Sequence, residues 1–183
     1  MDAFEQLVAE LLERRGYWVR NSFKVELTKD EKQKIGRHST PRWEIDLLAY
    51  SGNRKELLAV ECKSYLDSRG VTRKGFDGSD PKRAARYKLF NDDVLRDVVL
   101  NRLRMQLEGC GAIAPGTRIE LALASAKIAS KQDREWLQAH FKARGWVLLD
   151  DEQLRGELEN VAMAGYENQV AAVAAKILLR KVS

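Results

Sequence analysis

The sequence predicts an α/β protein in which helices flank a mixed central β-sheet and a helical extension follows at the C-terminus. Two strand-length apolar runs, 43–50 and 56–65, are joined by a polar turn containing Gly52 and Asn53, which indicates a β-hairpin. Outside their charged residues both runs are apolar on both faces, which is typical of central strands covered by helices on either side. Helical patterns precede and follow the hairpin, and 183 residues suit a single domain with a small appendage.

The first helix is predicted over residues 2–15, because apolar residues recur there with helical spacing and Gly16 provides a C-terminal stop. A strand is expected from Tyr17 to Thr28. Residues 29–41 are polar and show no periodicity, so we expect a mobile loop. Its basic side chains and His38 could contact a nucleic-acid backbone, or the loop could be an ordinary solvated turn.

After the hairpin, Asp67 to Asp80 forms a basic segment rich in glycine. Such a loop could hold phosphates, or it could be a flexible connector without contacts. A helix is predicted from Pro81 to a break at Asn91, and a long amphipathic helix from there to Glu108. A strand at 118–126, a helix that opens at Ser130 and ends at Gly145, and a short strand at 146–149 complete the predicted core, residues 1–150.

Residues 151–183 form the predicted extension, with helices at 151–164 and 166–181 separated near Gly165. The second helix gathers apolar residues on one face: Val170, Val173, Ala174, Ile177 and Leu178. We expect this face to pack within the chain. The alternative is a contact between the two copies of a homodimer.

Charge and composition narrow the class of protein. The net charge is +5, and residues 63–104 hold eleven basic and six acidic side chains. A basic surface suits a polyanionic partner, although solvated lysines and arginines are the plain alternative. No apolar run is long enough to span a bilayer, the N-terminus lacks a basic leader, and the two cysteines form no disulfide framework. We therefore expect no membrane contact and a cytoplasmic location, with Cys62 as a buried thiol.

Charged residues interrupt the hairpin in pairs: Glu44 with Asp46, and Glu61 with Lys63. Strand side chains alternate between faces, so the two members of each pair are expected on one face. Antiparallel pairing could gather all four on one patch of an apolar sheet. Carboxylates grouped in this way are costly unless a cation compensates them, and Mg²⁺ prefers such oxygen ligands. A buried ion-pair network is the alternative.

Asp46, followed after 14 residues by Glu61-Cys62-Lys63 on the next strand, resembles the PD-(D/E)XK nuclease superfamily. This superfamily includes many restriction endonucleases and Holliday-junction resolvases. Ile45 stands where the family usually has proline. The resemblance implies a restriction-endonuclease-like core and a Mg²⁺-dependent endonuclease that hydrolyses DNA phosphodiester bonds, with Mn²⁺ as a substitute ion.

The resemblance also implies roles for individual residues. Asp46, Glu61 and the backbone of Cys62 would hold the metal, and Lys63 would orient water or stabilise charge on the phosphoryl group. Glu5 on the first helix would join the catalytic set, although Asp2 and Glu5 also form a pattern typical of a capping box. Two further residues are auxiliary candidates, Glu44 and Gln106.

Nucleic acid is the expected partner, in the form of double-stranded or branched DNA, and a homodimer would suit double-strand cleavage. The residues expected to contact it are basic and follow the hairpin: Arg69, Arg73, Lys74, Lys82, Arg83 and Arg86. Two other functions stay open. One is an inactive nucleic-acid-binding module with the same fold, and the other is an RNase or nuclease subunit of a larger defence or repair system.

Overall fold

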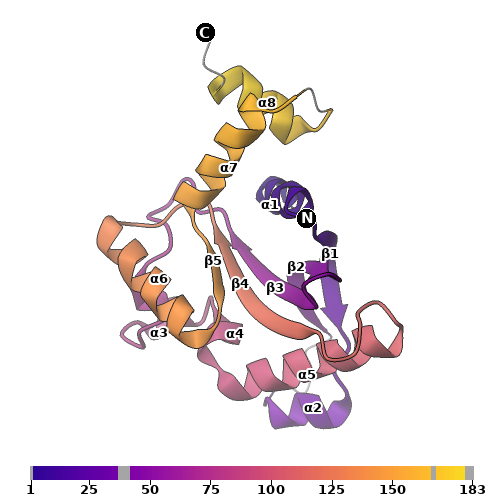
Figure 1. Cartoon of the computed structure of the whole chain (residues 1–183). Helices are drawn as coiled ribbons and strands as arrows, with labels where there is room; N and C mark the ends of the chain where they lie inside the picture. Colours follow the sequence, from indigo (N-terminus) through magenta and orange to yellow (C-terminus); the bar gives the residue numbers. More distant parts are fainter. Residues whose placement is uncertain (1, 37–41, 166–167, 180–183) are drawn as a thin grey trace.

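A computed structural model of the chain describes residues 2–36, 42–165 and 168–179. It contains a five-stranded mixed β-sheet with helices on both faces, which confirms the predicted α/β class (Figure 1). The strands lie side by side in chain order: β1 (Trp18–Val25), β2 (Trp43–Ser51), β3 (Glu56–Lys63), β4 (Arg118–Ser125) and β5 (Val147–Leu149).

The sheet changes from antiparallel to parallel at its centre. β1, β2 and β3 form an antiparallel meander, whereas β3, β4 and β5 are parallel. Parallel neighbours need a crossover connection. The long helix α5 (Asp93–Gly109) lies within the crossover from β3 to β4, and α6 (Lys131–Arg144) lies in that from β4 to β5. The other helical segments are α1 (Ala3–Arg14), α2 (Lys29–Lys34), the 3₁₀ turn η1 (Arg73–Gly75), α3 (Pro81–Ala84), α4 (Lys88–Asn91), α7 (Asp151–Met163) and α8 (Val170–Leu179).

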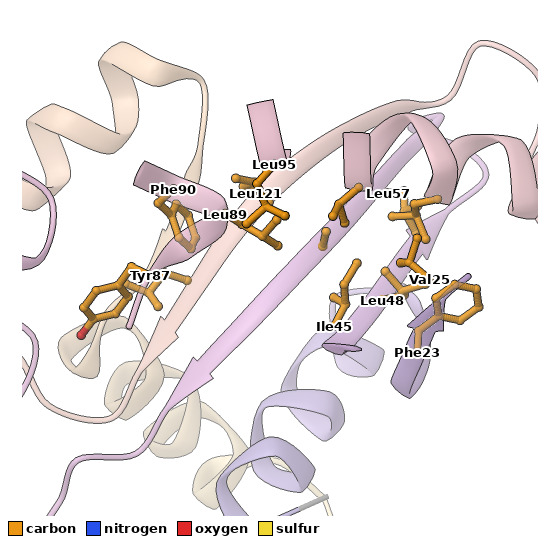
Figure 2. Packing of buried hydrophobic residues seen from close by; sticks show 14 of the residues in the cluster. Phe23, Val25, Ile45, Leu48, Leu57, Tyr87, Leu89, Phe90, Leu95 and Leu121 are labelled. Atoms are coloured by element: carbon orange, nitrogen blue, oxygen red, sulfur yellow. The ribbon is translucent and has the colours of Figure 1, made fainter. Parts of the chain in front are cut away.

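Both faces of the sheet carry apolar cores, as the two-sided apolar strands predict. Side chains such as Leu48 and Leu57 pack on one face beneath α4 and α5, together with Phe90, Leu95 and Leu121 (Figure 2). Residues of the opposite face, among them Leu47 and Val60, pack against α1 and the C-terminal helices. The sheet is therefore a middle layer packed on both faces, and its backbone positions the side chains at the ends of its strands.

The first helix begins as its sequence predicts. Asp2 accepts a hydrogen bond from the amide of Glu5 at 2.8 Å, and the Glu5 carboxylate accepts one from the amide of Asp2 at 3.2 Å. This capping box satisfies two amides that the helix itself leaves unpaired. The helix then buries Phe4, Val8 and Leu12 against the sheet.

The expectation of a loop at 29–41 is wrong for its first part, because Lys29–Lys34 form α2. Thr28 and Glu31 make a capping box, and Glu31 also pairs with Arg102 of α5 at 2.8 Å. The helix buries none of its residues, so it has no apolar stripe for a periodicity argument to detect. Residues 37–41, with His38, lie outside the described residues.

Replacing Glu31 by glutamine is expected to cost about 1–2 kcal/mol of unfolding free energy at neutral pH, because it removes charge-assisted hydrogen bonds to Arg102. Burial raises the pKa of Glu31, but hydrogen bonds from Arg102 and Thr28 outweigh it and hold the pKa below 4.5. The ionised Glu31 therefore contributes to the free energy of unfolding above pH 4.5, and this contribution is lost as pH falls through the folded-state pKa.

Urea denaturation of both proteins between pH 3 and 7 measures this difference. Glu26→Gln is the control, because Glu26 forms an exposed pair with Arg42 and is expected to cost less than about 0.5 kcal/mol. A constant difference between wild type and Glu31→Gln across this pH range would contradict the proposed ionic origin.

The single helix predicted from Pro81 to Asn91 is also wrong. The chain forms two short helices, α3 and α4, interrupted at 85–87. The side-chain amide of Asn91 donates to the carbonyls of Gly75, Ala84 and Tyr87, which fixes the bend. Tyr87 is buried there, with its ring 4.5 Å from that of Phe76.

Residues of α7 and α8 join the core that contains α1, and α8 packs on α7, as Figure 1 shows. Within α8 the buried residues are Ala172 and Ala175. The apolar face expected to pack within the chain is instead exposed at Val170, Val173 and Ile177. None of the described helices is long and apolar enough to cross a membrane.

Candidate functional site

A cavity of about 260 Å³ opens where β2 and β3 meet α4, on the face of the sheet that carries α5. It brings together the four charged residues of the hairpin, Glu44, Asp46, Glu61 and Lys63. Its remaining lining is apolar, apart from the cations Arg86 and Lys88. The gathering of these side chains that the hairpin pattern favoured is therefore present in the structure.

The sheet forks at this cavity. Within the described strands, the pairing of β2 with β3 ends at Leu47 and Val60, although both strands continue. The continuation of β2 stays paired with β1, while the continuation of β3 stays paired with β4. Asp46 bridges the fork, because its Oδ2 accepts a hydrogen bond from the backbone N–H of Cys62 at 2.8 Å.

The alternation of side chains along β2 breaks at Asp46. Ile45 packs in the same core as Leu48, whereas Leu47 packs in the opposite core. Ser22, which lies between the β1 residues paired with Ile45 and Leu47, has a φ of 49°. The regular alternation assumed from the sequence is therefore wrong for β2 between Ile45 and Leu47.

Glu61 and Lys63 form an ion pair, with 2.8 Å between Nζ and Oε1. Their side chains are 20% and 22% exposed, so the pair is shielded but reachable by solvent. Burial raises the pKa of Glu61, Lys63 opposes that rise, and Asp46 adds to it. For Lys63, burial lowers the pKa, but Glu61 and Asp46 outweigh it and the pKa is raised. The ammonium is therefore charged at neutral pH.

Glu5 approaches this cluster without lining the cavity. Its capping role on α1 is realised, and its pKa is raised, first by burial and further by the charge of Asp46. Cys62 is a half-buried thiol whose pKa is raised mainly by burial. Both residues belong to the electrostatic surroundings of Asp46.

The two auxiliary candidates differ in position. Glu44 lines the cavity and is exposed. Gln106 is absent from the described lining of the cavity, and its side-chain oxygen accepts a hydrogen bond from the amide of Glu26 at 2.9 Å. We therefore do not retain Gln106 as a site residue.

The basic candidates are distributed over three hollows. Arg86 lines the cavity of Asp46 and Glu61, whereas Arg69, Arg73, Lys74 and Arg83 line a second one. Lys82 lies with Arg73 and Lys74 at a shallower hollow nearby. The segment that carries them is folded, because Val71 and Phe76 are buried and the Val71 backbone pairs with residues 127 and 129.

Two tyrosines near the cluster were missed from the sequence. Tyr65 and Tyr87 share a hydrogen bond, and burial raises the pKa of Tyr87, with smaller contributions from Tyr65 and Glu61. Tyr65 follows the Glu61-Cys62-Lys63 segment by two residues and could have been noticed. Tyr87 comes from a separate part of the chain, and no local pattern signals it.

The donor set fits Mg²⁺ in its chemistry but supplies few ligands. Asp46 and Glu61 offer carboxylate oxygens, and Mg²⁺ is often held by one or two carboxylates, with waters and substrate phosphates completing its shell. Among the described residues, no group of three or more His, Cys, Asp or Glu side chains is arranged to hold a metal ion. Any ion here would therefore depend on water and substrate for most of its ligands.

Comparisons with known proteins add little. No family model matches the chain, and no curated protein matches it. The fold is similar to a crystal structure described as a protein of unknown function, AF1548, with 13% sequence identity and a TM-score of 0.40. That similarity covers 91% of this chain and 73% of the other chain, and it carries no functional information.

Proposed function

We propose that the protein is a divalent-metal-dependent nuclease that hydrolyses DNA phosphodiester bonds. The observation that supports this most strongly is the cavity at the fork of the sheet, where Asp46, Glu61 and Lys63 line one solvent-accessible hollow. Two acids and a lysine with this spacing resemble the PD-(D/E)XK nucleases. The meander followed by a parallel strand, with α1 packed on the sheet, is compatible with the core expected for that family.

In this proposal Asp46 and Glu61 hold Mg²⁺ or Mn²⁺. Bound there, the ion would polarise a phosphate oxygen and make a water molecule more acidic. Asp46 is already oriented by the amide of Cys62, which reduces the cost of ordering it for binding. Glu61 would exchange its contact with Lys63 for a contact with the ion.

Lys63 then has the role of a fixed cation. Because its pKa is raised, it is a poor general base and a good donor. Its ammonium would stabilise negative charge that develops on the phosphoryl oxygens. Arg86 and Lys88 at the rim add positive charge that attracts a polyanion to the cavity.

The test is cleavage of plasmid and four-way-junction DNA with Mg²⁺, Mn²⁺ or EDTA, comparing wild type with Lys63→Ala. We expect metal-dependent cleavage by wild type and a strong loss in the variant. A parallel RNA substrate distinguishes a DNase from an RNase. Intact substrates in every reaction, for a folded wild-type protein, would overturn the proposal.

Two observations favour a second function. Glu61 is already neutralised by Lys63, and the described residues present no group of three metal-binding side chains. A nucleic-acid-binding module that does not cleave would have these properties. It is distinguished by DNA binding that is unaffected by EDTA and accompanied by no cleavage with either ion.

A further inference from the structure

A second cavity, of about 320 Å³, is basic, and its lining residue Arg83 is two positions from Ala85, which lines the candidate catalytic cavity. Four cations line it: Arg69, Arg73, Lys74 and Arg83. Thr72, Ser130 and Gln132 add polar groups, and Asp133 is its one acidic lining residue. Four cations against one carboxylate give the hollow a net positive charge, which suits an anion such as a phosphate.

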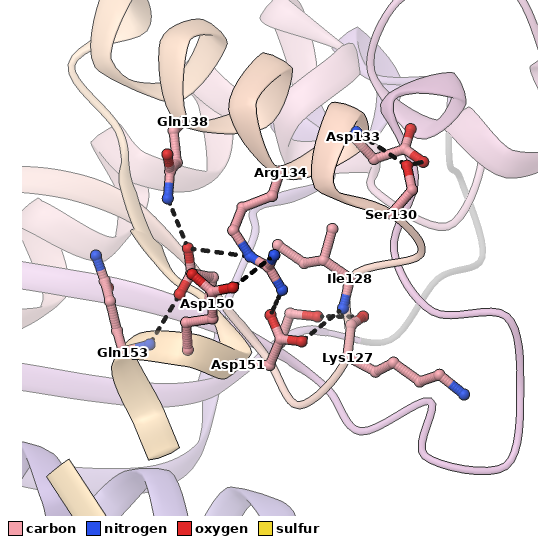
Figure 3. A network of polar contacts seen from close by, with 11 residues as sticks. Lys127, Ile128, Ser130, Asp133, Arg134, Gln138, Asp150, Asp151 and Gln153 are labelled. Atoms are coloured by element: carbon pink, nitrogen blue, oxygen red, sulfur yellow. Dashed lines mark hydrogen bonds and ion pairs between the residues drawn. The ribbon is translucent and has the colours of Figure 1, made fainter. Parts of the chain in front are cut away.

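The acids near this cavity are already occupied. Asp133 accepts hydrogen bonds from the amide of Arg73 at 2.9 Å and from the hydroxyl of Ser130 at 2.7 Å (Figure 3 shows the contact with Ser130). Asp80 pairs with Arg83 at 3.0 Å, and Asp77 accepts from the amide and hydroxyl of Ser79. These carboxylates serve to hold the loops in place.

Three cations keep their side chains available. All three are exposed, and among the described residues none forms an ion pair within 4 Å, although the charges of Arg73 and Lys74 help to lower the pKa of Asp77. The backbone next to Arg73 and Lys74 packs closely on Tyr87, because a Cβ at Gly75 would lie 2.6 Å from the Tyr87 ring. The loop therefore presents its charges from a fixed frame, which reduces the entropy lost on binding.

The two cavities are neighbours along the chain. Arg83 lines the second cavity, and Ala85 and Arg86 line the first. Consecutive Cα atoms are about 3.8 Å apart, so Arg83 and Ala85 lie within about 7.6 Å of each other. The phosphates of one strand repeat about every 3.4 Å along the axis of a duplex, so one strand could reach both cavities.

We propose that the cavity of Arg69, Arg73 and Lys74 binds a backbone phosphate of the same DNA strand whose scissile phosphate enters the cavity of Asp46 and Glu61. This inference rests on the proposed function in taking DNA as the substrate. The cavity is a positioning subsite, since none of its side chains lines the candidate catalytic cavity. It fixes the register of the strand and contributes affinity.

The test is the double variant Arg73→Gln/Lys74→Gln, with binding of a fluorescein-labelled 30-base-pair DNA measured by anisotropy in EDTA at several salt concentrations. We expect the Kd to rise about tenfold at 100 mM salt, and the slope of log K against log salt to become shallower by about one to two. Arg69→Gln alone is expected to have a smaller effect in the same direction. This single variant replaces the double variant in the test if the double variant folds poorly.

The matched control is Lys142→Gln/Arg144→Gln, which removes one lysine and one arginine, both exposed, from the far end of α6. It is expected to change the Kd by less than twofold. Equal losses in the two double variants would mean a diffuse charge effect and would overturn the subsite. Unchanged binding in both Arg73→Gln/Lys74→Gln and Arg69→Gln would also overturn it.

Cleavage assays separate this inference from the proposed function. If both hold, Arg73→Gln/Lys74→Gln raises KM about tenfold and leaves kcat close to that of wild type. If wild type cleaves and KM is unchanged in the variant, the subsite is wrong and the nuclease stands. If nothing is cleaved but the selective loss of affinity is seen, the nuclease is wrong and the phosphate site stands.

Discussion

Asp46→Asn is expected to lower the rate of DNA cleavage by about 10²–10³-fold while leaving the fold intact. The asparagine side chain has the same shape, and its oxygen can still accept the hydrogen bond from the amide of Cys62. What it loses is the negative charge that would hold a divalent cation. The change therefore tests the charge at the fork of the sheet separately from its geometry.

The control for this prediction is Glu44→Gln. Glu44 lines the same cavity but is exposed and, in the described structure, bridges no strands. The Glu44→Gln variant is expected to change the cleavage rate by less than about threefold. Single-turnover cleavage with Mg²⁺, with circular dichroism to verify folding, measures both variants. Equal losses in the two would indicate that the cavity acts only through its total charge.

Asp150→Ala is expected to destabilise the protein by about 3 kcal/mol, because Asp150 is a buried charge that joins α6 to α7. It is 1% exposed and accepts hydrogen bonds from the side chain of Gln138 and the amide of Gln153, each at 2.9 Å (Figure 3). Arg134 lies 3.9 Å away and is shared with Asp151. The alanine variant loses the cap of α7 and leaves these donors without an acceptor.

Thermal unfolding followed by circular dichroism measures this effect, and for a chain of this size about 3 kcal/mol corresponds to a Tm lower by about 6–12 °C. Asp150→Asn is expected to cost less, since asparagine also caps helices. Glu152→Gln is the surface control, because Glu152 pairs with the same arginine but is 69% exposed. A Tm shift in Asp150→Ala no larger than in Glu152→Gln would contradict the role assigned to the buried carboxylate.

The strands and long helices could be predicted because burial shaped their sequences. Leu47 and Leu48 face opposite cores, so β2 is apolar on both sides and reads as a central strand. The predicted start of α1 depends on local hydrogen bonds between Asp2 and Glu5, and it is correct for that reason. The predicted end of α6 is also correct, because Gly145 follows the helix with a φ of 67°, which favours glycine.

The misses have physical causes. α2 has no buried face, and its only local signal was Thr28 followed three residues later by Glu31, a capping-box pattern that could have been noticed. The break between α3 and α4 depends on Asn91 bonding to three carbonyls, a tertiary arrangement that no periodicity encodes. The exposed apolar face of α8 shows that helical spacing indicates an apolar face but cannot say what covers it.

The candidate site was predictable in composition and less so in geometry. The spacing of Asp46, Glu61 and Lys63 on two joined strands indicated that they could meet, and they line one cavity. The irregular backbone at Asp46 and the approach of Tyr87 were not indicated, because both depend on how distant segments pack. The cations of the second cavity were all among the residues expected to contact nucleic acid, but the cavity itself was not indicated, since its lining comes from two separate segments, 69–83 and 130–133.

The backbone N–H of Cys62 has an unusual hydrogen-bond acceptor for a residue inside a β-sheet. Its proton is held by the Asp46 carboxylate and not by a backbone carbonyl of β2. Deuterium uptake at this single position therefore reports on the side chain of residue 46, while uptake at neighbouring amides reports on the opening of the sheet. Loss of this hydrogen bond would make the Cys62 amide exchange faster without loosening the strands, which gives a readout of the Asp46 side chain that needs no turnover.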